Sequence, residues 1–132
     1  EAISPGVELI GVQAERMPSF YESWRQGKKV IVPRADTVAE GLAARSVFDL
    51  PYFILRERIQ EVVLLTEEEL ENGVRLALSY TRNLAEVAGA AALAAAFKIR
   101  QRLAGRKTVV VLTGGNLALD RLTSLLEHRR DG

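Results

Sequence analysis

The stretch "KTVVVLTGGNLALDRL", residues 107–122, decides how the rest of the chain is interpreted. A run of apolar, mostly β-branched residues leads directly into Thr-Gly-Gly-Asn, and a helical pattern follows at once. This order predicts a buried strand over 109–112, a turn over 113–116 and a helix over 117–129. Parallel α/β sheets place their ligands at such a turn, beyond the carboxyl end of a strand and before a helix N-terminus.

Two interpretations of the 113–116 turn remain open on the pattern alone. In the first, Gly114 and Gly115 let the backbone approach a ligand closely, and the Thr113 hydroxyl bonds that ligand. In the second, the turn only joins a strand to a helix, with Asn116 as the N-cap. A Walker phosphate loop is excluded, because Asn116 follows the glycines where that loop has Lys-Ser/Thr.

Strand and helix patterns alternate along the chain. Apolar runs predict further strands over 7–13 and 61–65, and helical patterns occupy 18–26, 48–59, 66–84 and 88–103. Thr66 and Glu69 form a capping box, and Gly27 and Gly105 are natural helix ends. Because the strands are continuous apolar runs, the pattern predicts an α/β fold, with a mostly parallel sheet flanked by helices, in a single domain over 1–132.

The helix over 88–103 begins with the small-residue run "AEVAGAAALAAAF", residues 85–97. Small side chains let other backbones approach closely, so this helix is either buried inside the fold or packed against something outside the chain. Glu86 is a carboxylate in apolar surroundings and needs a partner. It either bonds a cofactor or caps the helix after it. The segment over 37–45 is either a loop or a helix start, and Gly41 within it is either a close-approach glycine or part of a turn.

Composition excludes several function classes. The 132 residues carry 18 basic and 17 acidic side chains, a net charge of +1, so neither nucleic acid nor an anionic membrane is an expected partner. The absence of cysteine excludes disulfides and thiolate metal sites. His128 is the single histidine and lies in the last helix among arginines, so no Ser-His-Asp set and no metal-ligand cluster is expected. We expect a cytoplasmic protein.

Four motifs, in order, resemble the threonine dehydratase family and its serine dehydratase and serine racemase relatives. The segment "VVVLTGGN", residues 109–116, resembles that family's "VVLSGGN" strand and turn, and the 84–97 helix resembles its "VEGAGAAALAA" segment. "RADTVAEGLAAR" is similar to its "DTIADGLAV" loop, and "VELIGVQAERMPSFYESWRQGK" to its "VIGVEPEGAPSMYESLKAGK" segment. The order and spacing match across nearly the whole chain.

The resemblance implies a partial fold type II domain, similar to that of the tryptophan synthase β subunit, that depends on pyridoxal phosphate. The implied reaction is β-elimination of water from L-threonine or L-serine to give a 2-oxo acid and ammonia, with a link to isoleucine biosynthesis. By motif position, Thr113 bonds the pyridine nitrogen, Glu86 lies near the ring and Gly41 lines the ring edge. Gly114 and Gly115 shape the turn, and Asn116 fixes it.

The chain departs from the family pattern at several places. Val87 replaces a glycine, and Gln13 and Ser19 replace the acidic ligands of a divalent cation, so no metal site is predicted. The family's "SFKxRG" motif with the Schiff-base lysine and its "GGGGL" phosphate loop do not occur in the chain.

We therefore expect the C-terminal portion of a cofactor-binding large domain. Because the N-terminal half with the lysine is absent, no catalytic residue is assigned and the chain is expected to be inactive alone. Its opening residues look like the interior of a helix–turn–strand unit of a larger protein. Apolar surface meant for the missing half predicts homo-oligomers. The alternative is a non-catalytic module of the same fold that binds a small ligand or a partner.

Overall fold

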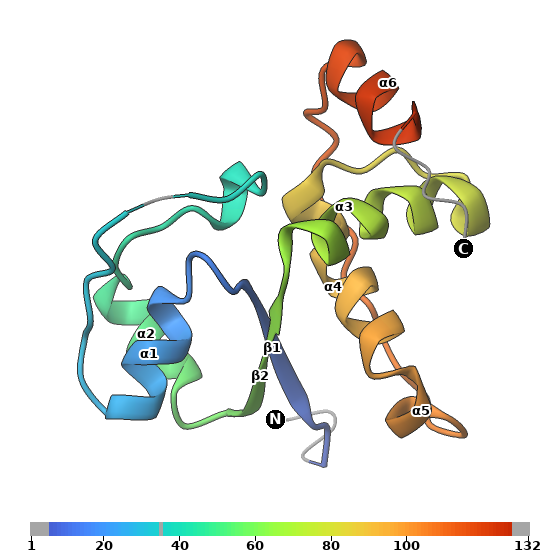
Figure 1. Ribbon diagram of the computed structural model, residues 1–132. Coiled ribbons are helices and arrows are strands. Elements are labelled where there is room, and N and C mark those ends of the chain that lie inside the picture. Colours follow the sequence, from blue (N-terminus) through green and yellow to red (C-terminus); the bar gives the residue numbers. More distant parts are fainter. Residues whose placement is uncertain (1–5, 35, 128–132) are drawn as a thin grey trace.

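The computed structural model describes residues 6–34 and 36–127 of the chain (Figure 1). Its centre is a parallel pair of strands, β1 (Leu9–Ala14) and β2 (Ile59–Leu65). Val12 pairs with Val63 and Ala14 with Leu65, after a register irregularity at the start of β1. Parallel strands need a long crossover. Here the crossover contains α1 (Ser19–Gln26), the 3-10 turn η1 (Glu40–Leu42) and α2 (Asp49–Leu55). The predicted parallel α/β arrangement is confirmed.

The third predicted strand, over 109–112, is wrong for the described residues. This segment runs beside α4 (Val87–Lys98), and just after it the Thr113 amide donates to the Gly89 carbonyl of the helix at 3.3 Å. Val109 is 91% exposed and Val111 64% exposed. A strand needs a neighbouring backbone that pairs with it residue by residue, and within the described part of the chain the segment has none.

The start of α1 is stabilised by a residue from β1. Pro18 occupies the N-cap position and has no side chain that accepts a hydrogen bond. The side-chain Oε1 of Gln13 accepts instead from the backbone N–H of Tyr21, at 2.8 Å. This bond satisfies one of the amide donors that a helix N-terminus leaves open. The helix ends as predicted at Gly27, whose φ is 67°.

The next two predicted helices are shorter than their patterns suggested. The helix expected over 48–59 ends at Leu55, and Ile59 already belongs to β2. After β2, α3 (Glu67–Leu76) begins with the predicted capping box, in which the Glu69 amide donates to the Thr66 hydroxyl at 3.1 Å. It passes into a π-helix, η2 (Ala77–Thr81), which ends where Arg82 takes a left-handed conformation with φ 59°.

The alanine-rich helix α4 is buried inside the fold, as one of the two interpretations predicted. It packs against α3, and a Cβ at Gly73 would lie only 2.8 Å from the carbonyl oxygen of Ala90. Such close packing of two helices is possible because both faces carry small residues. α4 ends at Lys98, and a separate short helix, α5 (Arg100–Leu103), follows it.

The last helix, α6 (Leu119–Glu127), lies over α3 (Figure 1) and buries Leu125. It begins two residues later than predicted. The predicted end at 129 and the single histidine, His128, lie outside the described residues, as does the expected helical opening over 1–5. No helix in the described part of the chain is long and apolar enough to cross a membrane.

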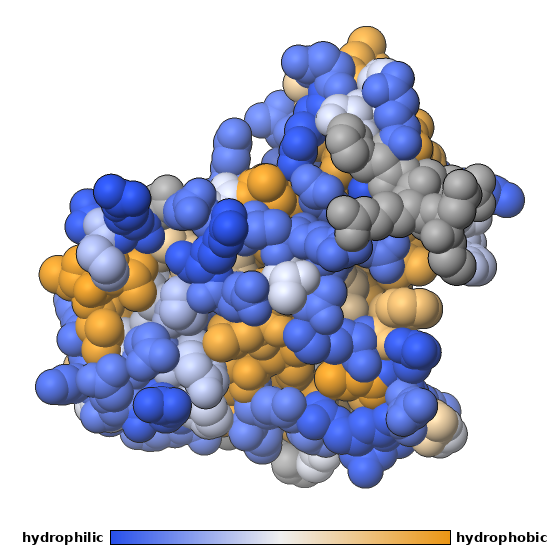
Figure 2. Space-filling view, viewed as in Figure 1, coloured by the Kyte–Doolittle hydropathy of each residue, from blue (hydrophilic) through white to orange (hydrophobic). Residues whose placement is uncertain are grey.

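Apolar side chains are exposed over α2 and the loop before it. Phe48 is 77% exposed, Leu50 70% and Phe53 53%. Figure 2 shows apolar surface on the side of the molecule that holds α1 and α2. Large contiguous apolar patches are uncommon on monomeric proteins, because exposing apolar side chains to water is unfavourable.

Candidate functional site

A hollow of about 490 Å³ lies between the loop before η1, the start of α4 and the start of α6. Its size falls in the range of small-molecule sites. The lining residues are Thr37, Val38, Glu40, Glu86, Val87, Ala88, Asn116, Leu117, Ala118, Asp120 and Arg121. Of the residues predicted for the site, Glu86 and Asn116 line this hollow directly. Gly41 and Gly114 contact residues that line it, whereas Thr113 and Gly115 lie outside the lining.

Glu86 occupies the N-cap position of α4, but its side chain does not cap the helix. Its backbone carbonyl accepts from the Ala90 amide at 3.0 Å. The carboxylate is half-buried and makes no hydrogen bond or ion pair with any other described residue. The capping interpretation is therefore wrong for the side chain. A half-buried carboxylate without a partner is costly, so its position on the hollow is suited to a ligand donor.

Gly114 lies directly against this carboxylate. Its φ is 73°, in the left-handed region that disfavours other residues, and a Cβ there would overlap with the Glu86 carboxylate. The Glu86 amide donates to the Gly114 carbonyl at 3.2 Å. The turn and the start of α4 are therefore joined directly through this hydrogen bond.

Gly89 brings Thr113 against α4, and the sequence analysis did not single it out. A Cβ at Gly89 would fall on the Thr113 carbonyl oxygen, so any side chain there would displace the extended segment. Thr113 itself is exposed, and its hydroxyl has no hydrogen-bond partner among the described residues. The signal was present in the small-residue run, where glycine stands among alanines although alanine is the better helix former.

Asn116 and Gly115 have different surroundings from those predicted. Asn116 is exposed on the hollow and is not an N-cap, because α6 begins only at Leu119. A Cβ at Gly115 would lie 3.5 Å from the Leu84 carbonyl, an ordinary contact. The turn is thus longer than the pattern suggested, and Asn116 is available to a ligand.

Gly41 places the loop of the hollow against the first turn of α4. It lies in η1, and a Cβ there would be 2.9 Å from the Cβ of Ala88. Gly41 therefore allows a close approach to α4 from within a 3-10 turn, and its contact with a ligand stays a prediction. Ala39, two residues before Gly41, is fully buried in the hydrophobic core, and this packing holds the loop in place.

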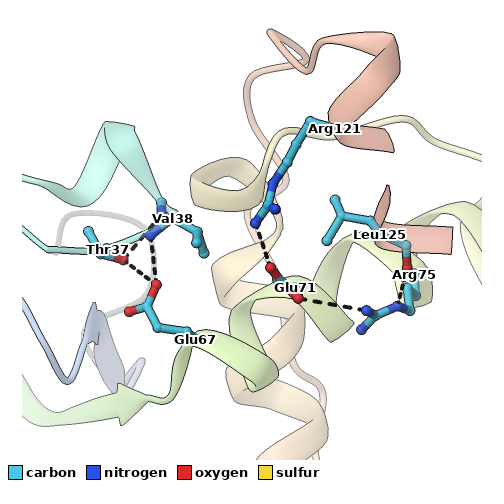
Figure 3. A network of polar contacts seen from close by, with 8 residues as sticks. Thr37, Val38, Glu67, Glu71, Arg75, Arg121 and Leu125 are labelled. Carbon is cyan, nitrogen blue, oxygen red and sulfur yellow. Dashed lines mark hydrogen bonds and ion pairs between the residues drawn. The ribbon is translucent and has the colours of Figure 1, made fainter. Parts of the chain in front are cut away.

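Polar contacts from α3 hold two parts of the lining (Figure 3). The Val38 amide donates to Glu67 Oε2 at 2.6 Å, and the Thr37 hydroxyl donates to the same oxygen at 3.1 Å. One turn further along, Glu71 accepts from Arg121 at 2.5 Å. Sequence reasoning missed these two carboxylates, because the acidic run "TEEELE", residues 66–71, looks like a solvated helix face.

Gln13 and Ser19, which stand where the family has acidic cation ligands, both form hydrogen bonds within the chain. Gln13 accepts from Tyr21 as described above, and Ser19 is buried, with its carbonyl accepting from the Ser23 hydroxyl at 2.6 Å. Within the described ranges, no group of three or more Asp, Glu, His or Cys side chains is placed to hold a metal ion.

Comparison with known proteins defines the class to which this arrangement belongs. Residues 1–114 match the family described as "Pyridoxal-phosphate dependent enzyme". The chain therefore belongs to the pyridoxal-phosphate-dependent enzyme family, and the fold and cofactor class predicted from the motifs are confirmed.

Individual relatives narrow the comparison. The chain is 31% identical over 126 residues to an L-threonine ammonia-lyase of Thermotoga maritima, covering 96% of this chain and 31% of that protein. It is 32% identical over 127 residues to the catabolic L-threonine dehydratase TdcB of Escherichia coli K12, covering 95% of this chain and 39% of that protein. The chain thus spans roughly a third of the length of these curated relatives.

A solved structure agrees with this placement. The processed form of threonine deaminase isoform 2 from Solanum lycopersicum superposes with a TM-score of 0.87 at 26% identity. The match covers 96% of this chain and 37% of that one. The similarity to it therefore includes nearly all of the present chain.

Proposed function

We propose that this chain is the C-terminal part of the catalytic domain of a pyridoxal-phosphate-dependent threonine/serine ammonia-lyase. The reaction would be β-elimination of water from L-threonine or L-serine, which gives a 2-oxo acid and ammonia, in the cytoplasm. The observation that carries the proposal is the half-buried carboxylate of Glu86, which has no partner among the described residues, lies on a ligand-sized hollow and is contacted by Gly114. The similarity to L-threonine ammonia-lyases adds the reaction class.

Two polar side chains of the lining, Glu86 and Asn116, support a pyridoxal phosphate ring at this place. The Thr113 hydroxyl lies outside the lining, directly before the Gly114 turn, and has no hydrogen-bond partner among the described residues. In the proposed arrangement Thr113 bonds the ring nitrogen, Glu86 lies near the ring, and the Gly41 loop lines its edge. The bound cofactor supplies an electron sink for the carbon–oxygen bond cleavage.

The Thr113 hydroxyl would set the electronic character of the ring. A hydroxyl is neutral and donates or accepts a single hydrogen bond, so it does not hold a proton on the ring nitrogen as a carboxylate would. Elimination then competes well against side reactions that need a fully protonated ring. Gly114 and Gly115 would keep the turn narrow enough for that hydroxyl to reach the ring, with Asn116 fixing the turn.

The remaining catalytic parts would lie outside this chain. None of the four described lysines lines the hollow. Lys98 donates to the Leu64 carbonyl and pairs with Glu69, Lys29 pairs with Asp49, and Lys28 and Lys107 are exposed. A charged lysine held by a carboxylate is a poor Schiff-base former. We therefore propose that the Schiff-base lysine and the phosphate loop come from the N-terminal half, that the chain is inactive alone, and that the enzyme is a homo-oligomer.

The test compares the chain with the complete protein that contains it. Pyridoxal phosphate is added to each, the absorbance spectrum is recorded, and borohydride reduction followed by peptide mapping locates the modified lysine. The expected result is a cofactor band and ammonia release from L-threonine or L-serine for the complete protein only, with a lysine outside residues 1–132 modified. A complete protein that neither binds the cofactor nor releases ammonia refutes the proposal.

A further inference from the structure

Two carboxylates on α3, Glu67 and Glu71, are one helical turn apart and therefore lie on the same face of the helix. Each binds a different part of the hollow. Figure 3 shows Glu67 directed to the 37–38 loop and Glu71 directed to Arg121 of α6. The two parts of the lining are thus attached to a single rigid element.

Glu67 holds the loop through its backbone. Its Oε2 accepts the Val38 amide at 2.6 Å and the Thr37 hydroxyl at 3.1 Å, and that hydroxyl in turn accepts from the Ala39 amide at 3.2 Å. Hydrogen bonds to an ionised acceptor are about twice as strong as neutral ones. The loop therefore has a fixed position relative to α3, directly before the Gly41 contact with α4.

The other oxygen of the same carboxylate shows that helix packing alone does not account for Glu67. Oε1 is buried and has no hydrogen-bond partner among the described residues. Burying a carboxylate oxygen without a donor is unfavourable. An apolar residue would avoid that cost, so the charge at position 67 is explained by the loop it orders.

Glu71 and Arg75 hold α6. Arg121 donates to Glu71 Oε1 at 2.5 Å, and Arg75 pairs with Glu71 at 3.7 Å while its Nε donates to the Leu125 carbonyl at 2.8 Å. The Glu71 side chain is only 23% exposed, so this pair is shielded from solvent more than a surface ion pair. The first turn of α6, which follows the 113–116 turn, is thereby fixed.

We infer that Glu67 and Glu71 are positioning residues, which set the separation of the 37–40 loop from the start of α6 and so the width of the ligand hollow. This inference rests on the proposed function, because the ligand concerned is pyridoxal phosphate. Neither residue needs to touch the cofactor. Each acts through the segment that it binds, and the two act on different segments.

The experiment uses the complete protein with Glu67→Ala, Glu67→Gln, Glu71→Gln and the control Glu68→Gln. Glu68 is an exposed residue in the same acidic first turn, so its replacement changes the helix charge equally. Hydrogen exchange by mass spectrometry measures the amide exchange rates of the 37–42 and 119–125 segments. Absorbance titration measures the Kd for pyridoxal phosphate.

Glu67→Ala is expected to speed exchange over 37–42 only, and Glu71→Gln over 119–125 only. Each is expected to raise the Kd about tenfold, the effect of losing one charge-assisted bond. Glu67→Gln keeps one acceptor oxygen, so its exchange rate over 37–42 and its Kd are expected to lie between those of Glu67→Ala and the wild type. This variant tests the inference if Glu67→Ala fails to fold.

Unchanged exchange in both segments, or equal effects from Glu68→Gln, overturns the inference. If the wild-type protein shows no spectral change with pyridoxal phosphate, the proposed function fails. In that case the segment-specific exchange alone decides whether Glu67 and Glu71 position the two walls.

Discussion

The Cα of Gly114 lies against the side-chain carboxylate of Glu86, so closely that a Cβ at position 114 would overlap with it. The two residues are also joined through the backbone, because the Glu86 amide donates to the Gly114 carbonyl at 3.2 Å. The 113–116 turn thereby fixes the position of the half-buried Glu86 carboxylate on the hollow.

Gly114→Ala should destabilise the protein by about 3 kcal/mol, from backbone strain and from overlap with Glu86. Gly105→Ala is a matched control. Gly105 has a similar φ of 76°, but nothing lies within 4 Å of the position its Cβ would take. The control should lose only about 1 kcal/mol, the strain alone. Urea unfolding of both variants measures the difference, and equal losses would show that the overlap with Glu86 is unimportant.

Gly89→Ala should also destabilise, although alanine is the better helix former by about 1 kcal/mol. The new Cβ would fall on the Thr113 carbonyl and push the extended segment away from α4. Hydrogen exchange should show the Thr113 amide losing protection, since it donates to Gly89. A gain in stability would mean that the segment moves away without cost.

Thr113 should tolerate serine but not valine in the complete enzyme. Serine keeps the hydroxyl proposed to bond the cofactor ring, whereas valine keeps the shape and removes the hydroxyl. Losing such a hydrogen bond costs about 1–3 kcal/mol, which corresponds to roughly a 10- to 100-fold fall in kcat/KM. Ammonia release from L-threonine measures it. Equal activity of the serine and valine variants would remove Thr113 from the site.

Gln13→Ala should lower the stability of the protein by about 1 kcal/mol, the typical value of an N-cap bond. Gln13 is the residue whose side chain accepts the Tyr21 amide at the start of α1. Gln13→Glu keeps an acceptor oxygen and adds a favourable charge at the helix N-terminus, so it should retain the wild-type stability. Thermal unfolding compares the two. A similar loss in both would mean that the bond to Tyr21 is not the source of the effect.

The isolated chain should form dimers or larger species at micromolar concentration, because α2 exposes large apolar side chains. Leu50 is 70% exposed and Phe53 53% exposed. Replacing both with lysine should shift the population toward monomer, whereas replacing exposed Glu68 with lysine should not. Light scattering after size-exclusion chromatography measures the mass. A monomeric wild-type chain would contradict the prediction.

Local signals in the sequence predicted the elements that depend on nearby residues. Thr66 and Glu69 fix the start of α3, Gly27 fixes the end of α1, and the small-residue run makes α4 a buried helix. The same pattern failed over 109–112, because an apolar run shows that a segment is suited to a sheet and does not supply the neighbour that would pair with it.

The sequence by itself determined the parallel α/β class, the start of α3 at Thr66 and the end of α1 at Gly27, because spacing and capping act over a few residues. Only the tertiary structure decided which residues form the hollow. Glu67 and Val38 are 29 residues apart, and Gly114 lies against Glu86 from another segment. Contacts of this kind depend on the packing of α3, α4 and the loops around them, and no local pattern records that packing.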